Sequence, residues 1–192
     1  MLNSFSATQK LAIDTARQVI AQNPVYLDTE TTGLDRSDEI IEISVIDDSG
    51  ETLFESLVKP SRPIPEDTMR VHHISNEAVS AASTWPVVWT QVRPVLFGRL
   101  IVLYNAEFDL RMISQSHMRY GFPMKDKINS FDLLKLYAQF RGEWDARRGS
   151  YRFHSLADAG RQCHISLPNA HRATADTLLT RALLHYIAEY QG

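Results

Sequence analysis

Val25–Gly33 reads Val-Tyr-Leu-Asp-Thr-Glu-Thr-Thr-Gly, an apolar start that runs into two acids one residue apart. The first three residues favour a strand, and Pro24 before them cannot continue a helix. Side chains two residues apart on a strand point to the same face, so Asp28 and Glu30 present two carboxylates side by side. Without a cation these groups repel each other, whereas a divalent metal uses them as oxygen ligands. The alternative is an acidic turn closed by Gly33.

The segments around this strand predict a helix before it and an antiparallel meander after it. Ser6-Ala7-Thr8-Gln9 has the form of a capping box, and apolar residues follow at helical spacing until Asn23 and Pro24 end the helix. Residues 39–47 alternate apolar and polar side chains, as a half-buried strand does, and residues 51–58 form a third strand beyond a turn. Short turns between three strands indicate antiparallel neighbours.

Farther along the chain, strands alternate with helices. Residues 100–104 form an apolar run typical of a buried parallel strand, and residues 127–131 form a short last strand. Helices are expected over residues 66–70, 85–97, 106–120, 132–140, 155–163 and 173–190. This order predicts an α/β fold with a mixed five-stranded sheet, in which a three-strand antiparallel meander joins parallel strands, flanked by helices. We expect residues 1–23 to be an amphipathic helix packed on one domain formed by residues 24–192.

The composition limits the kind of protein. The chain has 192 residues, 44% of them hydrophobic, which suits one compact domain. It contains no apolar run of ~18 residues and no signal-peptide pattern, so we expect no membrane span. Cys163 is the single cysteine, so no internal disulfide can form and a cytoplasmic location is expected. The formal charge of −3 argues against broad coating of nucleic acid, but metals and arginines can reverse the sign locally.

Two further places in the sequence are candidates for the same site. Asp109 lies in the first turn of the helix expected over 106–120, where the macrodipole favours an acid. His171 and Asp176 are five residues apart, which is ~140° of rotation on a helix, so the two side chains would diverge there. They converge if Asp176 lies on the helix and His171 on the loop entering it. The plainer alternatives are a helix-start acid at Asp109, a solvated loop histidine, and a helix-face charge at Asp176.

Three motifs resemble those of the DEDDh-type 3′–5′ exonucleases of the DnaQ family, within the ribonuclease H-like superfamily. Asp28-Thr29-Glu30-Thr31-Thr32-Gly33-Leu34 resembles the first motif, and Asn105-Ala106-Glu107-Phe108-Asp109 resembles the second. His171 with Asp176 resembles the third motif, in the version that uses His rather than Tyr. The motifs stand in the order of the family and the resemblance covers about residues 24–188, which implies a ribonuclease H-like fold.

The resemblance implies a 3′–5′ exonuclease that acts on single-stranded DNA 3′ ends and releases nucleoside 5′-monophosphates. Two Mg²⁺ ions per site, with Mn²⁺ as a substitute, are implied as cofactors of such a reaction. The implied metal ligands are Asp28, Glu30, Asp109 and Asp176, and the implied general base is His171. Two alternatives stay open: an RNA-trimming enzyme of the same fold, and a noncatalytic nucleic-acid-binding or polymerase-partner module. A polymerase or repair partner is not readable from the sequence.

The resemblance also implies contacts with the terminal nucleotide. They involve Thr31, Leu34, Asp67, His72, Asn105 and Phe108, with Leu34 as a wedge against the last base. Phe108 is equally compatible with ordinary core packing. Tyr104 stands where the family often has His, and His73 stands where it usually has Gly. If glycine is required there for a positive φ, the backbone at residue 73 must differ from that of the family.

Residues 141–152 have no place in the minimal fold and contain four arginines and two acids. Arginine interleaved with Trp144 and Tyr151 suits a single strand, through phosphate pairing and base stacking. Arg147 and Arg148 are therefore candidates for substrate binding, and on an extended loop they would point to opposite sides. The alternative is a solvated loop whose Trp144 packs on the domain.

Overall fold

A mixed five-stranded sheet in the order β3-β2-β1-β4-β5 forms the centre of the computed structural model, which describes residues 6–121, 124–125, 127–165 and 172–191. Its strands are β1 (Val25–Thr31), β2 (Ile40–Asp47), β3 (Thr52–Leu57), β4 (Ile101–Leu103) and β5 (Ser130–Asp132). β1, β2 and β3 are antiparallel neighbours, while β4 pairs in parallel with β1 and with β5. The predicted fold, a three-strand meander joined to parallel strands, is confirmed.

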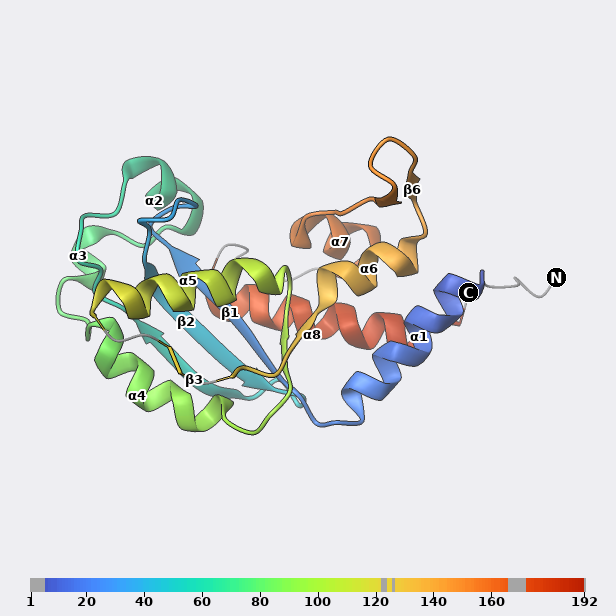
Figure 1. Cartoon of the computed structure of the whole chain (residues 1–192), viewed down its shortest axis with the longest axis horizontal. Coiled ribbons are helices and arrows are strands. Elements are labelled where there is room, and N and C mark those ends of the chain that lie inside the picture. The colour runs from blue at the N-terminus through green and yellow to red at the C-terminus, as the bar shows by residue number, and fades with distance from the viewer. Residues whose placement is uncertain (1–5, 122–123, 126, 166–171, 192) are drawn as a thin grey trace.

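Helices cover both faces of this sheet (Figure 1). They are α1 (Ala7–Ile20), α2 (Glu66–His72), α3 (Asn76–Val79), α4 (Trp85–Leu96), α5 (Ala106–Arg119), α6 (Leu133–Arg141), α7 (Leu156–Gln162) and α8 (Ala173–Glu189). In the described part of the chain, none of these helices is both long enough and apolar enough to cross a membrane.

The alternation of side chains along β1 divides the core into two layers. Tyr26 is fully buried in a cluster with residues of α1, α6 and α8. Its neighbours Val25 and Leu27 point the other way, into a cluster with residues of α4 and α5. The strand is therefore buried on both faces, as expected of the central strand of an α/β sheet.

The N-terminal helix α1 begins and packs as its sequence predicts. The side chain of Ser6 accepts a hydrogen bond from the backbone N–H of Gln9 at 3.1 Å, which forms one half of the capping box. Ala12 and Ala16 are fully buried, and the helix lies against α6 and α8. Arg17 also donates to the carbonyl of Ala188 at 2.9 Å, so α1 is joined to the end of the last helix.

Strand β2 differs from the half-buried strand that its alternation predicts. Glu42 and Ser44 were expected on a solvated face, but they are 1% and 0% exposed. The reason is that α8 lies against β1 and β2 and covers this face. The polar positions of β2 therefore lie beneath the helix that carries Asp176.

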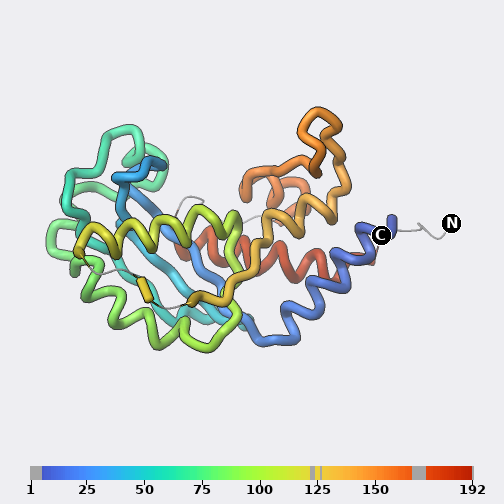
Figure 2. The backbone as a smooth tube through the Cα atoms, in the orientation of Figure 1, coloured from blue at the N-terminus to red at the C-terminus, as the bar shows by residue number. Residues whose placement is uncertain are grey.

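The arginine-rich segment folds as a hairpin of β6 (Trp144–Asp145) and β7 (Ser150–Tyr151), so the expectation of an extended loop is wrong. Its turn closes through a hydrogen bond from the Gly149 N–H to the Asp145 carbonyl at 2.9 Å. Trp144 is 59% exposed and meets the ring of Tyr151 edge-on at 5.3 Å, so it packs on the hairpin and not on the domain. Figure 2 shows the chain rise from α6 into this hairpin and return to α7.

Candidate active site

Three carboxylates converge where the end of β1 meets the start of α8. Asp28 and Glu30 are half-buried and alternate with the buried Thr29 and Thr31, so both acids face the same side of β1. Asp176 lies in the first turn of α8. One carboxylate oxygen from each of the three acids lies within 4.8 Å of the others. The structure thus brings together acids that are nearly 150 residues apart in sequence.

Asp109 borders this cluster from the side of α5. It lies in the first turn of the helix and is 3% exposed. Its Oδ1 atom accepts a hydrogen bond from the Thr29 hydroxyl at 2.7 Å. Because Thr29 stands between Asp28 and Glu30, this contact holds the fourth acid next to the other three. The helix N-terminus also favours a negative charge at this position.

Burial raises the pKa values of Asp28, Glu30 and Asp109. Burial is the larger cause for Asp28, whose pKa lies well above its usual range, and the charges of Asp109, Asp176 and Glu30 raise it further. Burial and the charge of Asp176 raise the pKa of Glu30 to about 8. Burial raises the pKa of Asp109 to about 7, against the lowering effect of the Thr29 hydroxyl. A cluster of hard carboxylate oxygens that repel one another fits a divalent cation such as Mg²⁺ or Mn²⁺.

An ion pair between the buried Glu42 and the partly exposed Arg172 fixes the start of α8. Glu42 pairs with Glu30 across the β1–β2 ladder, and Arg172 Nε lies 3.1 Å from each of its carboxylate oxygens. The backbone N–H of Ala173 also donates to Glu42 at 2.9 Å. The carboxylate therefore caps the helix whose first turn carries Asp176. Sequence reasoning missed this pair, although an acid inside an apolar strand is a signal for a cationic partner.

His171 lies outside the described residues, so the structure does not test its predicted place on the loop before α8. The described chain resumes at Arg172 and enters α8 beside Glu42.

The loop that carries Leu34 is fastened to α5. Leu34 is 75% exposed, and its carbonyl accepts a hydrogen bond from Arg111 Nη1 at 3.1 Å. Gln115 Nε2 donates to the carbonyls of Asp35 and Asp38 at 3.1 and 3.2 Å. Sequence reasoning missed Arg111 and Gln115, because their partners lie far away in sequence. The apolar side chain of Leu34 is thus held out on an anchored loop.

The remaining second-motif residues lie at the start of α5. Asn105 is exposed and has a φ of 69° directly before the helix. Phe108 is partly buried against the core on the α4–α5 side, and the guanidinium of Arg111 lies 5.3 Å from its ring centroid. Core packing of Phe108 is therefore present, and a contact with substrate stays a prediction. Thr31 is buried and its hydroxyl donates to the carbonyl of Gly33 at 2.8 Å.

His72 is a buried imidazole with one nitrogen left without a partner. It is 2% exposed, and its Nδ1 accepts a hydrogen bond from the N–H of Ile74 at 3.0 Å. The neutral ring then carries its proton on Nε2, which has no hydrogen-bond partner among the described residues. Burial lowers the pKa of His72, so the ring is a neutral donor near neutral pH. Asp67, by contrast, is exposed at the start of α2.

His73 ends α2 with a φ of 59°. A positive φ at this position therefore does not require glycine in this chain. The histidine itself takes the left-handed conformation, at a cost of about 1–2 kcal/mol relative to the right-handed region. Its N–H donates to the carbonyl of Met69 at 2.9 Å and closes the helix end.

Comparison with known proteins agrees with this geometry. The profile of the family described as Exonuclease matches residues 25–184, a range that includes all four acids. The chain belongs to this exonuclease family. The DnaQ-like resemblance of its three motifs is thereby supported, and the protein is an enzyme of the nuclease class.

Relatives and solved structures extend the match. This exonuclease is 34% identical over 191 residues to "Uncharacterized exonuclease CP81" of Escherichia phage 186, covering 96% of this chain and 98% of that protein. It is 32% identical to a "DNA polymerase III subunit epsilon-like protein" of Rhodobacter capsulatus, covering 81% of this chain but only 22% of that protein. Among solved structures, "Exonuclease X in complex with 5′ overhanging duplex DNA" is 26% identical with a TM-score of 0.62, covering 85% of this chain and 89% of that one.

The hairpin of the exonuclease holds its remaining candidate residues. Arg147 and Arg148 are exposed at the turn between β6 and β7. With Trp144 and Arg152 they line an open hollow of about 680 Å³. Figure 1 shows the hairpin and α2 rising on the same side of the molecule, apart from each other. The arginines thus stand on a hairpin that projects beyond α6.

Proposed function

We propose that this exonuclease removes nucleotides from the 3′ end of single-stranded DNA and releases nucleoside 5′-monophosphates. The observation that carries the proposal is the convergence of oxygens from Asp28, Glu30 and Asp176 within 4.8 Å. Phosphodiester hydrolysis in nuclease sites commonly uses cations held by such carboxylates. The 26% identical neighbour is an exonuclease in complex with 5′ overhanging duplex DNA, which supports nucleic acid as the partner of this chain.

We infer that Asp28, Glu30 and Asp176 hold one Mg²⁺ and that Asp28 and Asp109 hold a second, with Mn²⁺ as a substitute. When bound, the cations supply Lewis-acid polarisation and offset the negative charge of the scissile phosphate. The protein contributes the fixed positions of its acids. Thr29 orients Asp109 through a 2.7 Å hydrogen bond, and the Glu42–Arg172 pair fixes the helix that carries Asp176.

The other residues bind the strand and move a proton. We propose that His171 accepts the proton of the attacking water, a role that suits an imidazole near neutral pH. The 3′-terminal nucleotide is held by Thr31, Leu34, Asp67, His72, Asn105 and Phe108. His72 supports this assignment best, because its buried Nε2 lacks a partner among the described residues. Buried donors of this kind are expected to find a partner when the ligand binds.

We also propose that residues 24–192 form the exonuclease domain and that residues 1–23 are an addition packed on it. The family match begins at residue 25, after α1. A reducing cytoplasm suits the single cysteine, because Cys163 is buried in the core beside α6 and α8.

Digestion of matched DNA and RNA strands tests the proposal. Strands labelled at the 3′ end should release the labelled mononucleotide at once, whereas strands labelled at the 5′ end should shorten stepwise, both in Mg²⁺. DNA should be degraded faster than RNA of the same sequence. Faster RNA digestion would favour the RNA-trimming alternative, since sugar selection depends on contacts at the 2′ position. Internal fragments without mononucleotides would contradict 3′–5′ exonuclease action.

Glu42→Gln should lower turnover and apparent Mg²⁺ affinity about 10–100-fold, the usual cost of removing a group that orients metal ligands. The glutamine side chain has the same size as Glu42 and fits its place in β2, but it lacks the charge that holds Arg172. The Michaelis constant for an oligonucleotide should change little, because Glu42 is 1% exposed and does not reach substrate. Steady-state kinetics over a Mg²⁺ titration measure both effects. Glu55→Gln is the matched control, since Glu55 accepts a hydrogen bond from Thr174 on the same helix; a similar loss there would contradict the specific role of Glu42.

Replacing Arg147 and Arg148 together by Gln should weaken binding of strands several nucleotides long by about tenfold. Cleavage of a nitrophenyl ester of a nucleotide should be nearly unchanged, because the acids lie on β1, α5 and α8 and none of them lies on the hairpin. The salt dependence of binding should flatten by up to ~0.7 units of slope for each phosphate of the single strand that the variant no longer neutralises. Lys10→Gln with Arg161→Gln is the control, since both side chains are exposed on other helices. Equal losses on long and minimal substrates would show that the hairpin supports the active site instead.

A further inference from the structure

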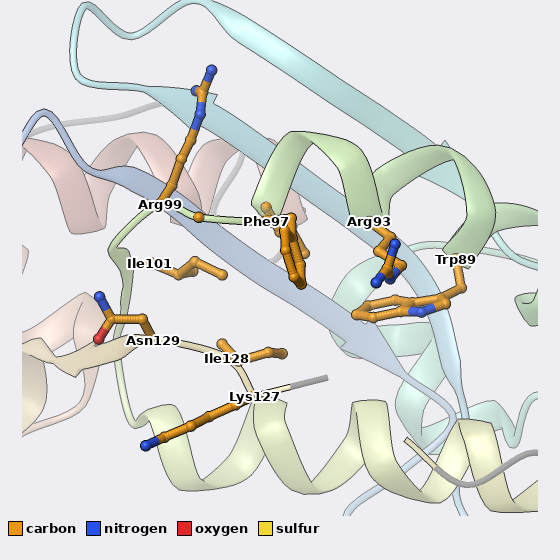
Figure 3. Close-up of a pocket in the computed structure, with 10 residues that line it drawn as sticks. Trp89, Arg93, Phe97, Arg99, Ile101, Lys127, Ile128 and Asn129 are labelled. Carbon is orange, nitrogen blue, oxygen red and sulfur yellow. The ribbon is translucent and has the colours of Figure 1, made fainter. Parts of the chain in front are cut away.

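A pocket of about 260 Å³ lies where the end of α4 meets the strand edge, and the proposed function does not use it (Figure 3). We call it the α4 pocket. It is lined by Trp89, Arg93, Leu96, Phe97, Gly98, Arg99, Ile101, Lys127, Ile128 and Asn129.

The α4 pocket lies at the end of the sheet opposite the catalytic acids. β1 and β4 are parallel, and Val25 pairs with Ile101 at the start of both strands. Asp28 follows Val25 by three residues, which is ~10 Å along an extended strand. The acids therefore lie toward the carboxyl ends of the strands and the pocket lies at the amino end of β4. A molecule bound in the pocket leaves the catalytic edge open to nucleic acid.

The floor of the pocket is apolar and its rim carries an exposed aromatic ring. Trp89, Leu96 and Ile101 are buried in the α4–α5 core, whereas Phe97 is 61% exposed. Pockets for whole small-molecule ligands usually measure ~300–1,000 Å³, so this smaller one suits one or two inserted side chains. Exposed aromatic residues beside arginine are typical of the energetic centres of protein interfaces.

Arg99 and Lys127 supply positive charge beside this apolar floor. Arg93, Arg99 and Lys127 are exposed, and the described residues that line the pocket include no carboxylate. Figure 3 shows Arg99 and Lys127 extending away from each other on two sides of the pocket, with Arg93 near the rings of Phe97 and Trp89. The chain as a whole has a formal charge of −3, so this surface differs in sign from the average of the molecule. It is complementary to an anionic partner.

We propose that the α4 pocket binds an acidic segment of a partner protein, with one aromatic or branched apolar side chain inserted between Phe97 and Ile128. The carboxylates of that segment pair with Arg99 and Lys127, and the inserted side chain fills the apolar floor. Single-stranded nucleic acid fits less well, because it requires cations in line along its backbone and open aromatic faces for stacking. Here Arg99 and Lys127 lie on two sides of one hollow, and the guanidinium of Arg93 lies 4.8 Å from the ring centroid of Phe97.

A labelled peptide with the sequence Asp-Glu-Asp-Glu-Leu-Phe tests this site by fluorescence anisotropy. It should bind the full chain saturably, and replacing its Phe by Ser should weaken binding about tenfold. Arg99→Glu and Lys127→Glu should each weaken binding about 5–10-fold, and Phe97→Ala should do so without changing charge. Lys10→Glu, an equal charge reversal on α1, should leave binding unchanged. Exonuclease activity on a short oligonucleotide should be the same in all four variants.

Other outcomes would overturn the proposal. The first is that the peptide fails to bind at about 1 mM, the weakest range of specific association. The second is that the pocket variants bind the peptide as well as the Lys10→Glu control does. Displacement of the peptide by a thymidine decamer through the same residues would assign the surface to nucleic acid. A sedimentation shift from dimer to monomer in the Arg99→Glu variant would assign it to a second copy of this chain.

Discussion

Asp28→Asn should reduce the rate of nucleotide release by about 10³-fold or more, since loss of one carboxylate that would hold the proposed cations removes several kcal/mol of transition-state stabilisation. Asp28 interacts electrostatically with the three other acids, because the charges of Asp109, Asp176 and Glu30 each raise its pKa. Single-turnover release of a 3′-terminal labelled nucleotide in Mg²⁺ measures the effect.

Chelation should reproduce this loss in the unmodified protein. Excess chelator should stop the reaction, and added Mg²⁺ or Mn²⁺ should restore it. Asp14→Asn, which removes a half-exposed acid from α1, is the control for loss of one carboxylate and should keep full activity. Undiminished cleavage in excess chelator would contradict the metal-dependent account.

Asp28→Asn should also stabilise the metal-free protein at alkaline pH. The pKa of Glu30 is raised from 4.5 to about 8 and that of Asp28 is raised as well, so the folded state binds more protons than the unfolded state between these values. The free energy of unfolding of the metal-free protein therefore falls as pH rises through this window. At pH 8, Asp28→Asn should raise that free energy by about 1–3 kcal/mol, because the repulsion within the cluster decreases.

Urea denaturation at pH 5 and pH 8 in chelator measures this effect. The gain in the variant should be larger at pH 8, where the unmodified cluster is charged, and Mg²⁺ should stabilise the unmodified protein more than the variant. Identical stabilities at both pH values would show that the acids do not repel one another as their arrangement indicates.

The predictable parts of the fold are those that depend on residues close together in sequence. The alternation of Val25–Thr31 and the capping box at Ser6 each depend on neighbours in sequence, and both are present in the structure. The hairpin of β6 and β7 was not predictable in this way, because two-residue strands are too short to show a period. The burial of Glu42 was also not predictable, since it depends on α8 lying over β2.

The residues of the candidate site also fall into a predictable group and an unpredictable group. The spacing of Asp28 and Glu30 places two carboxylates on one face without knowledge of the fold. The contacts that hold the site instead join distant residues, such as Glu42 with Arg172, 130 positions apart, and Arg111 with Leu34, 77 positions apart. A single sequence carries no period that links such pairs. The acids were therefore predictable, and the residues that position them were not.

His171→Ala should lower turnover by about 10²–10⁴-fold, the usual contribution of a general base, while binding of single-stranded DNA in Ca²⁺ is largely kept. The role is assigned from the third motif, in which His171 precedes Asp176 by five residues. Arg172, the first described residue after this motif histidine, is held by Glu42. His185→Gln is the control, since His185 pairs with Asp48 and is not one of the three motifs.

The pH dependence separates a base from a residue that only supports the loop. With His171 present, the rate should rise with pH as the imidazole loses its proton, around the ordinary histidine pKa of ~6.5, until another group limits it. The His171→Ala variant should lose this rise, and added imidazole should restore part of the rate, because a free base can then accept the proton of the attacking water. A loop that has lost only its packing would show a lower rate with the same pH profile and no rescue. An unchanged rate would return His171 to the solvated-loop alternative and assign proton removal to another group at the carboxylate cluster.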